Sequence, residues 1–530
     1  MYYGLNDDTA IRNIISGNYS GTPDGHAIYM KYPLTGVLSM LYKINGNIPW
    51  YSICMTLLFA VGVMAILWGI YHKVKGRSRL NIGAAFAFGC SLIVAFFIPQ
   101  YLLLHYTLVA ALLAAGALFL VALDVPVIWP VILWLLCFCV RSQVFYLSMP
   151  FLLVAIVWRI FSKEWKKYLR LILLLAATIG LCSAINTLMY AGPQWQEYTE
   201  YNEARTQLYD YLGVLPFEEH KEMYDEAGIS REQYELIQQY GLLLDTSIDA
   251  KQLKKLAELT EQQIGNQKLQ KTYLKKTLTE YYYYVRYTSA PYNLIAGLLY
   301  AGLFILLAAG KKIWKIVLEA ACIAGRSMIW IFLIWQGRFP ERISLSLHIL
   351  EIFLLAGLLT YEMLQEKKKY VAISVIGIGV LLTAAGISLS VQSGRQAAEQ
   401  GIRQQDWNIL EAYCAERKEN FYLLDVYSVV GYTDKVWSKS PAADNVALAG
   451  GWLADSPLWQ NKVKQWENAD GATALTDRED VLYIAKPERD LSWLEQFLQT
   501  GRPGGRLKQV DLISQSGEKV FTVYRFTLNE

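Results

Sequence analysis

Residues 49–71 read PWYSICMTLLFAVGVMAILWGIY, an apolar stretch without a charged side chain. A helix of about 20 residues crosses the hydrocarbon layer of a membrane, so this stretch is long enough to span it. Other stretches of the same character follow: Leu80–Ile98, Tyr101–Leu123, Val125–Val140, Gln143–Phe161, Leu169–Tyr190, Tyr292–Ala309, Ile313–Trp335, Ile343–Met363 and Tyr370–Leu389. We therefore predict an α-helical polytopic membrane protein with about ten spans.

The composition agrees with a membrane protein. Hydrophobic residues make up 54% of the chain and charged residues 18%, whereas a soluble domain has about 25% charged residues. The formal net charge of +3 is too small to indicate a nucleic-acid partner. The seven cysteines form no disulfide framework. Cys137 and Cys139 have no His or Cys partner at metal-site spacing, so we interpret them as packing residues.

Basic residues predict the orientation of the spans, because Lys and Arg gather on cytoplasmic loops. Such clusters follow four of the spans. They are Lys73–Arg79 after the first, Arg159–Arg170 (which includes Lys163) after the fifth, Lys311–Lys315 after the seventh and Lys367–Lys369 after the ninth. Alternation through the spans places all of these clusters on one side. Residues 1–48, 191–291, Gln336–Arg342 and everything after 390 are then extracytoplasmic. Such an N-terminal loop needs a preceding span or signal for export, so we expect a further helix before Met1.

These boundaries divide the chain into five parts. They are an extracytoplasmic loop with interfacial helices (1–48), a first bundle part (49–190), an extracytoplasmic helical insertion (191–291), a second bundle part (292–390) and an extracytoplasmic α/β domain (391–530). Insertion helices are predicted over Tyr198–Leu212, Arg231–Tyr240 and Ala250–Tyr284.

In the last part we predict a helix over Gly401–Lys418 and strands over Phe421–Val426, Val446–Ala449, Val481–Ala485, Leu507–Ser514 and Lys519–Thr527. Its sequence shows no phosphate-binding glycine loop and no metal-ligand cluster. The glycines of 450–451 and 501–505 favour turns. We interpret this domain as a binding or stabilising module.

The first loop carries the adjacent acids Asp7 and Asp8 just before a predicted amphipathic helix. Ile11, Ile14 and Ile15 form its apolar stripe and Gly17 its end. We expect this helix to lie in the membrane interface with its stripe towards lipid, followed by a second amphipathic stretch over Leu34–Ile44. The acids admit two interpretations: a helix cap, or a general base or divalent-cation site. A cap uses only one acid.

Arginines near the expected outer face are the other candidates. Arg338 and Arg342 lie in the short Gln336–Arg342 loop and Arg141 at the end of a span, against the usual charge bias. A guanidinium suits bidentate binding of a lipid phosphate. For Arg338 the alternative is anchoring to lipid headgroups, with Glu341 as a local partner.

Two ionisable residues fall inside predicted spans. His105 is a functional candidate by its position, and the alternative is a hydrogen bond between helices. Arg326 must face the bundle interior or water, with Glu319 or Glu351 as its expected partner.

This order of an acidic first loop, many spans, a polar insertion and an outer αβ domain resembles the GT-C glycosyltransferases. These are integral membrane enzymes that move a sugar from a polyprenyl-phosphate carrier to an acceptor. The stretches YGLNDD (3–8), GTPDGH (21–26) and GRFPER (337–342) are similar to stretches in multi-spanning bacterial proteins of this type. The resemblance covers roughly residues 1–390.

The resemblance implies roles for particular residues. Asp7 and Asp8 would be catalytic, and it leaves open whether a divalent cation binds there. The substrate-binding candidates are Arg338, Arg342, Arg141, His105, Asp24 and His26. The implied partners are a lipid-linked sugar donor, membrane lipid and a cell-envelope acceptor that is a glycan, lipid or protein. The implied location is the bacterial plasma membrane.

Two other classes remain open. A transporter, or a lipid or polysaccharide flippase, explains the spans and the intramembrane charges. It does not explain the large outer domain or the paired acids, and the sequence shows no inverted repeat. A non-catalytic assembly protein on the same scaffold is the remaining alternative.

Overall fold

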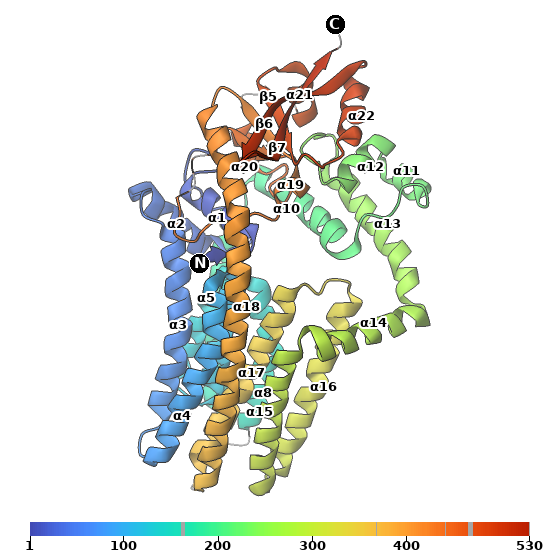
Figure 1. Cartoon of the computed structure of the whole chain (residues 1–530). Coiled ribbons are helices and arrows are strands. Elements are labelled where there is room, and N and C mark those ends of the chain that lie inside the picture. The colour runs from blue at the N-terminus through green and yellow to red at the C-terminus, as the bar shows by residue number, and fades with distance from the viewer. Residues whose placement is uncertain (161–164, 367, 440, 442, 465–469, 529–530) are drawn as a thin grey trace.

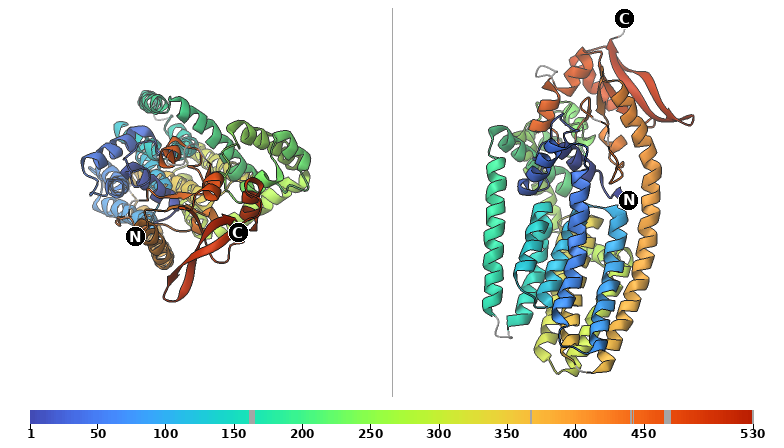
Figure 2. Two further views of the ribbon diagram at one scale, coloured as in Figure 1. Left: turned by 90° about the horizontal axis from the view of Figure 1, so that it is seen from above. Right: turned by 90° about the vertical axis from the view of Figure 1, so that its left-hand side faces the viewer.

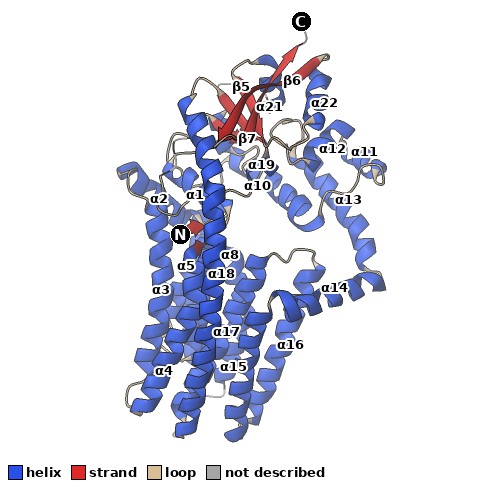
Figure 3. Ribbon diagram, in the orientation of Figure 1, coloured by secondary structure: helices blue, strands red, loops and turns tan. Residues whose placement is uncertain are grey.

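The computed structural model describes residues 1–528 except 161–164, 367, 440, 442 and 465–469. Phe161, Lys163 and Lys367, which belong to the predicted fifth span and basic clusters, lie outside the described residues. A bundle of long helices carries shorter helices and a small sheet at one end, which we call the cap (Figure 1, Figure 3). The N-terminus lies where the bundle meets the cap (Figure 2).

Within the described residues, eight helical segments are long and apolar enough to cross a membrane. They are α3 (Trp50–Lys73), α4–η1–α5 (Arg79–Leu92, Ile93–Phe97, Ile98–Leu102), α8 (Ser142–Ile160), α9 (Trp165–Met189), α15 (Ala290–Ala309), α16 (Ile313–Trp335), α17 (Glu341–Gln365) and α18 (Lys369–Glu416). Two shorter apolar helices, α6 (Tyr106–Ala122) and α7 (Ile128–Val140), occupy the other predicted positions. Each predicted span therefore overlaps a helix, and two of these helices are shorter than a full crossing.

The third predicted span, Tyr101–Leu123, is not one helix. Leu103–Leu104 form strand β2, which pairs in parallel with β1 (Tyr2–Tyr3). This pairing brings the start of the chain to the end of the bundle. His105 then starts α6 as its N-cap residue, so it precedes the span rather than lying inside it. Hydropathy did not reveal this break because the extended residues are themselves apolar.

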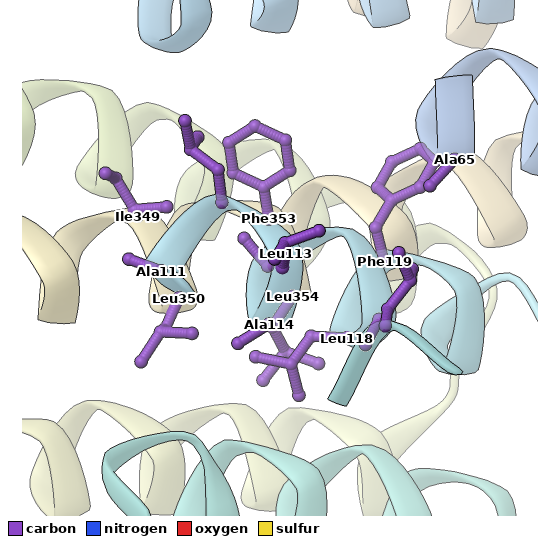
Figure 4. Close-up of a cluster of buried hydrophobic side chains, with 14 of the residues drawn as sticks. Ala65, Ala111, Leu113, Ala114, Leu118, Phe119, Ile349, Leu350, Phe353 and Leu354 are labelled. Carbon is purple, nitrogen blue, oxygen red and sulfur yellow. The ribbon is translucent and has the colours of Figure 1, made fainter. Parts of the chain in front are cut away.

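The centre of the bundle is the contact between α6 and α17. Every residue of α6 is buried. Figure 4 shows side chains of this contact, with Leu113 of α6 near Phe353 of α17 and Phe119 of α6 near Ala65 of α3. A Cβ atom at Gly357 would lie 2.6 Å from the Cβ of Ala122, so glycine allows these two helices to approach closely. Apolar side chains thus fill the space between them.

Basic residues from the predicted cytoplasmic loops meet at one end of the bundle. Lys73 and Lys167 both pair with Asp124. Lys312 Nζ lies 2.6 Å from Glu362 Oε2. Of the last cluster, Lys368 is the N-cap residue of α18 and Lys369 its first residue. The cap lies at the opposite end (Figure 1). This is the arrangement that the charge pattern predicts, while the side of the membrane stays a prediction.

The insertion forms one part of the cap. Its helices are α10 (Pro193–Thr206), η2 (Gln207–Leu212), α11 (Lys221–Ala227), α12 (Arg231–Gln238), α13 (Ala250–Lys268), α14 (Lys271–Tyr283) and η3 (Tyr284–Thr288). The helix predicted over 250–284 is therefore interrupted between Lys268 and Lys271. Apolar residues such as Leu236 and Leu243 share one buried cluster with Trp493 and Leu494 of the C-terminal domain. The insertion and that domain thus pack as one body.

The C-terminal domain is a five-stranded mixed sheet in the order β4-β3-β5-β7-β6, flanked by short helices. The strands are β3 (Phe421–Leu424), β4 (Val446–Leu448), β5 (Val481–Ala485), β6 (Gly505–Gln515) and β7 (Glu518–Leu528), and all five match predicted strands. The helices are α19 (Val426–Val429), α20 (Pro457–Lys462), α21 (Gly471–Asp477) and α22 (Ser492–Gly501).

Helix α18 joins this domain to the bundle without a break. It contains both the tenth predicted span and most of the helix predicted over Gly401–Lys418. The change from apolar to polar composition near residue 390 therefore marks where the helix leaves the apolar part of the bundle, and it does not end the helix.

The first loop folds into α1 (Asn6–Ser16) and α2 (Tyr32–Ile44), and α1 ends as predicted at Gly17, whose φ is 84°. The expectation that the apolar stripe of α1 faces lipid is wrong. Ile11 and Ile15 are fully buried in the main core, and Ile14 packs with Leu453 of the C-terminal domain. The stripe packs on protein because the cap covers it.

The orientation is testable by thiol labelling. A cysteine replacing the exposed Gln460 is expected to react with a membrane-impermeant maleimide in intact cells. A cysteine replacing the exposed Lys75, at the other end of the bundle, is expected to react only after permeabilisation. The chain without added cysteine measures background labelling of the native thiols. The reverse pattern would overturn the predicted orientation.

Candidate active site where the bundle meets the cap

The carboxyl of Asp8 is fully buried where α1 meets α3 and α6. Its Oδ1 accepts hydrogen bonds from the Tyr51 hydroxyl at 2.8 Å and from the Tyr106 backbone N–H at 3.1 Å. Burial raises the pKa of Asp8 well above its usual value. The N-cap residue of α1 is Leu5, and no side chain caps the helix, so the capping interpretation is wrong. Asp8 anchors α1 instead.

Asp7, the preceding residue, is half-buried in different surroundings. Burial raises its pKa, and the guanidiniums of Arg342 and Arg141 oppose that effect without reversing it. Asp210 of the insertion adds to the rise. A carboxylate near cations and still with a raised pKa is suited to accept a proton. Of the two predicted catalytic acids, Asp7 is thus the one in a charged site.

Contacts on both sides of α1 set its position. Backbone bonds Gly4 N–H to Leu104 O, at 2.8 Å, and Tyr3 N–H to Asp434 O, at 3.0 Å, hold the preceding strand. Within α1, Arg12 forms a buried ion pair with Asp434 of the C-terminal domain. The helix that carries Asp7 is therefore held between the bundle and the C-terminal domain.

Arg141 comes from the bundle, immediately after α7. Its Nη1 donates to the Tyr106 hydroxyl at 2.8 Å. Its guanidinium also lies over the rings of Tyr29 and Tyr106, at 5.0 and 5.2 Å from their centroids. These contacts orient the guanidinium and leave its charge acting on Asp7.

His105 presents a hydrogen-bond donor beside Arg342. Its Nδ1 accepts the backbone N–H of Thr107 at 2.9 Å, so the proton of the neutral ring is on Nε2. That Nε2 is buried and has no hydrogen-bond partner among the described residues. The predicted bond between helices is therefore absent from the described contacts of His105, which caps its own helix.

A cavity of about 550 Å³ opens beside His105 and Arg342. Its polar wall includes the bases Arg342 and Arg403, the acids Glu341 and Glu399, and His105, Gln396 and Gln400, and its apolar wall includes Leu103, Leu108, Leu345 and Leu389. The volume falls within the usual range of ligand pockets, about 300–1,000 Å³. The part of the wall with Arg342, Arg403 and the His105 Nε2–H suits an anionic head group, and the leucines suit an apolar chain attached to it.

Arg338 is oriented towards the insertion. It forms an ion pair with Asp210, with Nη2 2.9 Å from Oδ2, and its guanidinium lies 4.7 Å from the centroid of the Tyr211 ring. The expected local partner, Glu341, is not the residue that it pairs with. Arg338 thus fixes Asp210, one of the acids that act on Asp7. Its predicted role in phosphate binding stays a prediction.

Asp24 and His26 form a separate contact. The Asp24 carboxylate accepts from the backbone N–H of His26 at 2.7 Å and lies 2.6 Å from its Nδ1. The imidazole stacks on Trp195, with centroids 4.4 Å apart, and its Nε2 lies 3.0 Å from the carbonyl oxygen of Met189. These contacts hold the first loop against the end of α9, and their predicted substrate role is untested.

Among the described residues, no group of three or more His, Cys, Asp or Glu side chains is arranged to hold a metal ion. A divalent cation at Asp7 and Asp8 stays a prediction.

Sequence reasoning missed Asp210, Tyr29 and Trp452, all of which belong to the surroundings of Asp7 or Arg141. Only Trp452, an aromatic residue after two glycines, carried a local signal that could have drawn attention to it.

The anchoring role of Asp8 predicts a loss of stability. Tyr51→Phe removes one of the two donors to a buried carboxyl, which costs about 1–3 kcal/mol. We expect a lower Tm for the purified Tyr51→Phe protein in detergent, and a Tm close to wild type for Asp7→Asn. Equal losses in the two variants would contradict the different roles of the two acids.

No family model matches the chain, and no curated protein matches its sequence. A search of solved structures finds a likeness to the crystal structure of ArnT from Cupriavidus metallidurans bound to undecaprenyl phosphate. The alignment covers 98% of this chain and 94% of that chain, with 11% sequence identity and a TM-score of 0.39. A likeness at that level does not assign a function to this chain.

Proposed function

We propose that this chain is a membrane glycosyltransferase that moves a sugar from a polyprenyl-phosphate donor to an acceptor outside the cytoplasm. The observation that carries the proposal is the position of Asp7. It is a half-buried acid under the charges of Arg141 and Arg342, and Arg342 lines the amphipathic cavity at the end of the bundle. This combines a base, cations for a phosphate and an apolar surface for a lipid chain.

Asp7 would act as the general base. It would take the proton of an acceptor hydroxyl while the hydroxyl oxygen forms a bond to the anomeric carbon of the sugar. The bond between that carbon and the carrier's phosphate oxygen breaks, and the phosphate leaves with the electron pair. Attack opposite to the leaving group inverts the configuration at the anomeric carbon.

The cavity would bind the carrier's phosphate. Arg342 offers a planar fork of donors, and His105 offers its Nε2–H, so both would stabilise the charge that develops on the leaving phosphate. The leucines of the apolar wall would contact the first isoprene units. The remaining lipid chain would then lie along the outside of the bundle.

A transporter remains the alternative, and the charges inside the bundle bear on it. Arg326 Nε lies 3.0 Å from Glu351 Oε2, and the Tyr300 hydroxyl donates to Glu351 Oε1 at 2.8 Å. Glu351 is one of the two partners that the sequence predicted. These groups neutralise one another, and apolar side chains fill the α6–α17 contact, so a structural role accounts for the pair. We therefore favour transfer.

The proposal predicts transfer activity that depends on Asp7. Purified protein is incubated with radiolabelled polyprenyl-phosphate-linked hexoses and pentoses and with cell-envelope glycan, lipid and protein fractions. We expect label in one of these fractions, and a rate lower by about a hundredfold or more for Asp7→Asn, the usual contribution of general-base catalysis.

The control for this experiment is Asp477→Asn. Asp477 lies on the C-terminal domain and pairs with Arg502 across the surface, so its loss is expected to leave the rate unchanged. Turnover by Asp7→Asn at the wild-type rate would overturn the proposal. Movement of the labelled lipid across vesicles without transfer would favour the transporter.

The charges around Asp7 predict a pH dependence. Transfer needs the ionised carboxylate, so the rate falls as the pH drops through the pKa of Asp7. Burial raises that pKa, while Arg342 and Arg141 lower it and Asp210 raises it. Arg342→Gln removes a lowering charge and is expected to move the acid limb of kcat to higher pH. If the acid limb of kcat in Arg342→Gln stays at the wild-type pH, the group that titrates in that limb is not Asp7.

A further inference from the structure

The loop after β4 reaches from the C-terminal domain towards the bundle. Gly450 passes so close to the insertion that an added Cβ atom would lie 1.7 Å from the carbonyl oxygen of Tyr240. Gly451 follows with a φ of 96°, a conformation that favours glycine. Two successive glycines are thus required for the backbone path, and the residue that this path delivers is Trp452.

Trp452 extends from this loop to the surroundings of Asp7. Its side chain is among the groups that lower the pKa of Asp7. Its ring centroid lies 4.9 Å from that of Tyr29, at an interplanar angle of 55°. The Tyr198 hydroxyl donates to its carbonyl oxygen, which holds the backbone of the loop in place. Trp452 is half-buried and therefore not enclosed by protein.

Tyr29 connects this tryptophan to the cationic part of the site. Arg141 lies over the Tyr29 ring, and Arg205 Nη2 lies 3.5 Å from the Tyr29 hydroxyl. Trp452, Tyr29 and Arg141 therefore follow one another beside Asp7. Arg342 lines the cavity together with His105. The positive charge of Arg342 lies close enough to influence both His105 and Asp7 electrostatically.

A sugar ring needs this combination of groups. Its C–H faces are apolar and pack on aromatic rings, while its hydroxyls bond to carboxylates and guanidiniums. The carrier's phosphate, by contrast, needs only cations and donors, which Arg342 and His105 supply. The aromatic pair thus has no part in phosphate binding and is available to the sugar.

We propose that Trp452 and Tyr29 form the subsite for the sugar ring of the donor, so that the C-terminal domain completes the active site. The inference rests on the proposed glycosyltransferase function and deepens it. The ligand class is a pentose or hexose joined to a polyprenyl phosphate. The predicted binding module thus acts by placing one aromatic residue beside Asp7.

The test compares Trp452→Leu and Trp452→Phe with wild type. Initial rates are measured against the concentration of the labelled polyprenyl-phosphate sugar that wild type uses. Loss of the aromatic face is expected to raise KM for that donor roughly tenfold in Trp452→Leu, the size of one aromatic stacking contact. Trp452→Phe keeps a ring and is expected to retain most of the affinity.

Trp493→Phe is the matched control, because Trp493 is buried in the same domain and packs against the insertion rather than near Asp7. Binding gives a second readout. Wild type is expected to bind the sugar-bearing carrier more tightly than polyprenyl phosphate alone, and Trp452→Leu is expected to lose this preference while it binds polyprenyl phosphate normally. If Trp452 served packing alone, Trp452→Leu would weaken the binding of both ligands or of neither.

The outcomes separate the two proposals. A wild-type protein that transfers no sugar would overturn the proposed function, and the subsite with it. An active wild type together with Trp452→Leu of unchanged KM and unchanged preference would overturn the subsite alone. A folded Trp452→Phe with the donor affinity of Trp452→Leu would also contradict stacking, since it retains an aromatic face.

Discussion

The buried carboxyl of Asp8 ties the first loop to the membrane bundle. It receives the Tyr51 hydroxyl from α3 and the Tyr106 backbone N–H at the start of α6. Moving it would leave buried polar groups without partners, which is costly. Helix α6 is itself buried along its whole length against its neighbours. The direction of α1, and therefore the position of Asp7, follows from this one anchor.

The cap adds the second constraint on the same helix. Asp434 of the C-terminal domain accepts the backbone N–H of Tyr3 and pairs with Arg12 of α1. Helix α18 runs unbroken from the bundle into that domain and lines the cavity on its way. The domain at the end of the chain therefore lies beside the loop at its beginning. This accounts for the contact of Trp452 with the surroundings of Asp7.

Local chemistry explains why much of the fold could be predicted. A backbone in lipid must satisfy its hydrogen bonds internally, so long apolar stretches such as residues 49–71 become helices. A short apolar run bounded by polar residues, such as Val481–Ala485, indicates a buried strand for a similarly local reason. The Arg326–Glu351 pair was predictable because an intramembrane charge needs a partner. Breaks inside apolar runs, such as Leu103–Leu104, give no such signal.

The sequence by itself determined the helical membrane class, the helix positions, the one-sided basic clusters and the acidic first loop. Only the tertiary structure decided which acid faces which surroundings. Successive residues on a helix point about 100° apart, so Asp8 became an anchor while Asp7 met Arg141 and Arg342. The tertiary structure also pairs Arg338 with Asp210 and places Trp452 against Tyr29. These neighbours come from distant segments, and no local pattern encodes such distances.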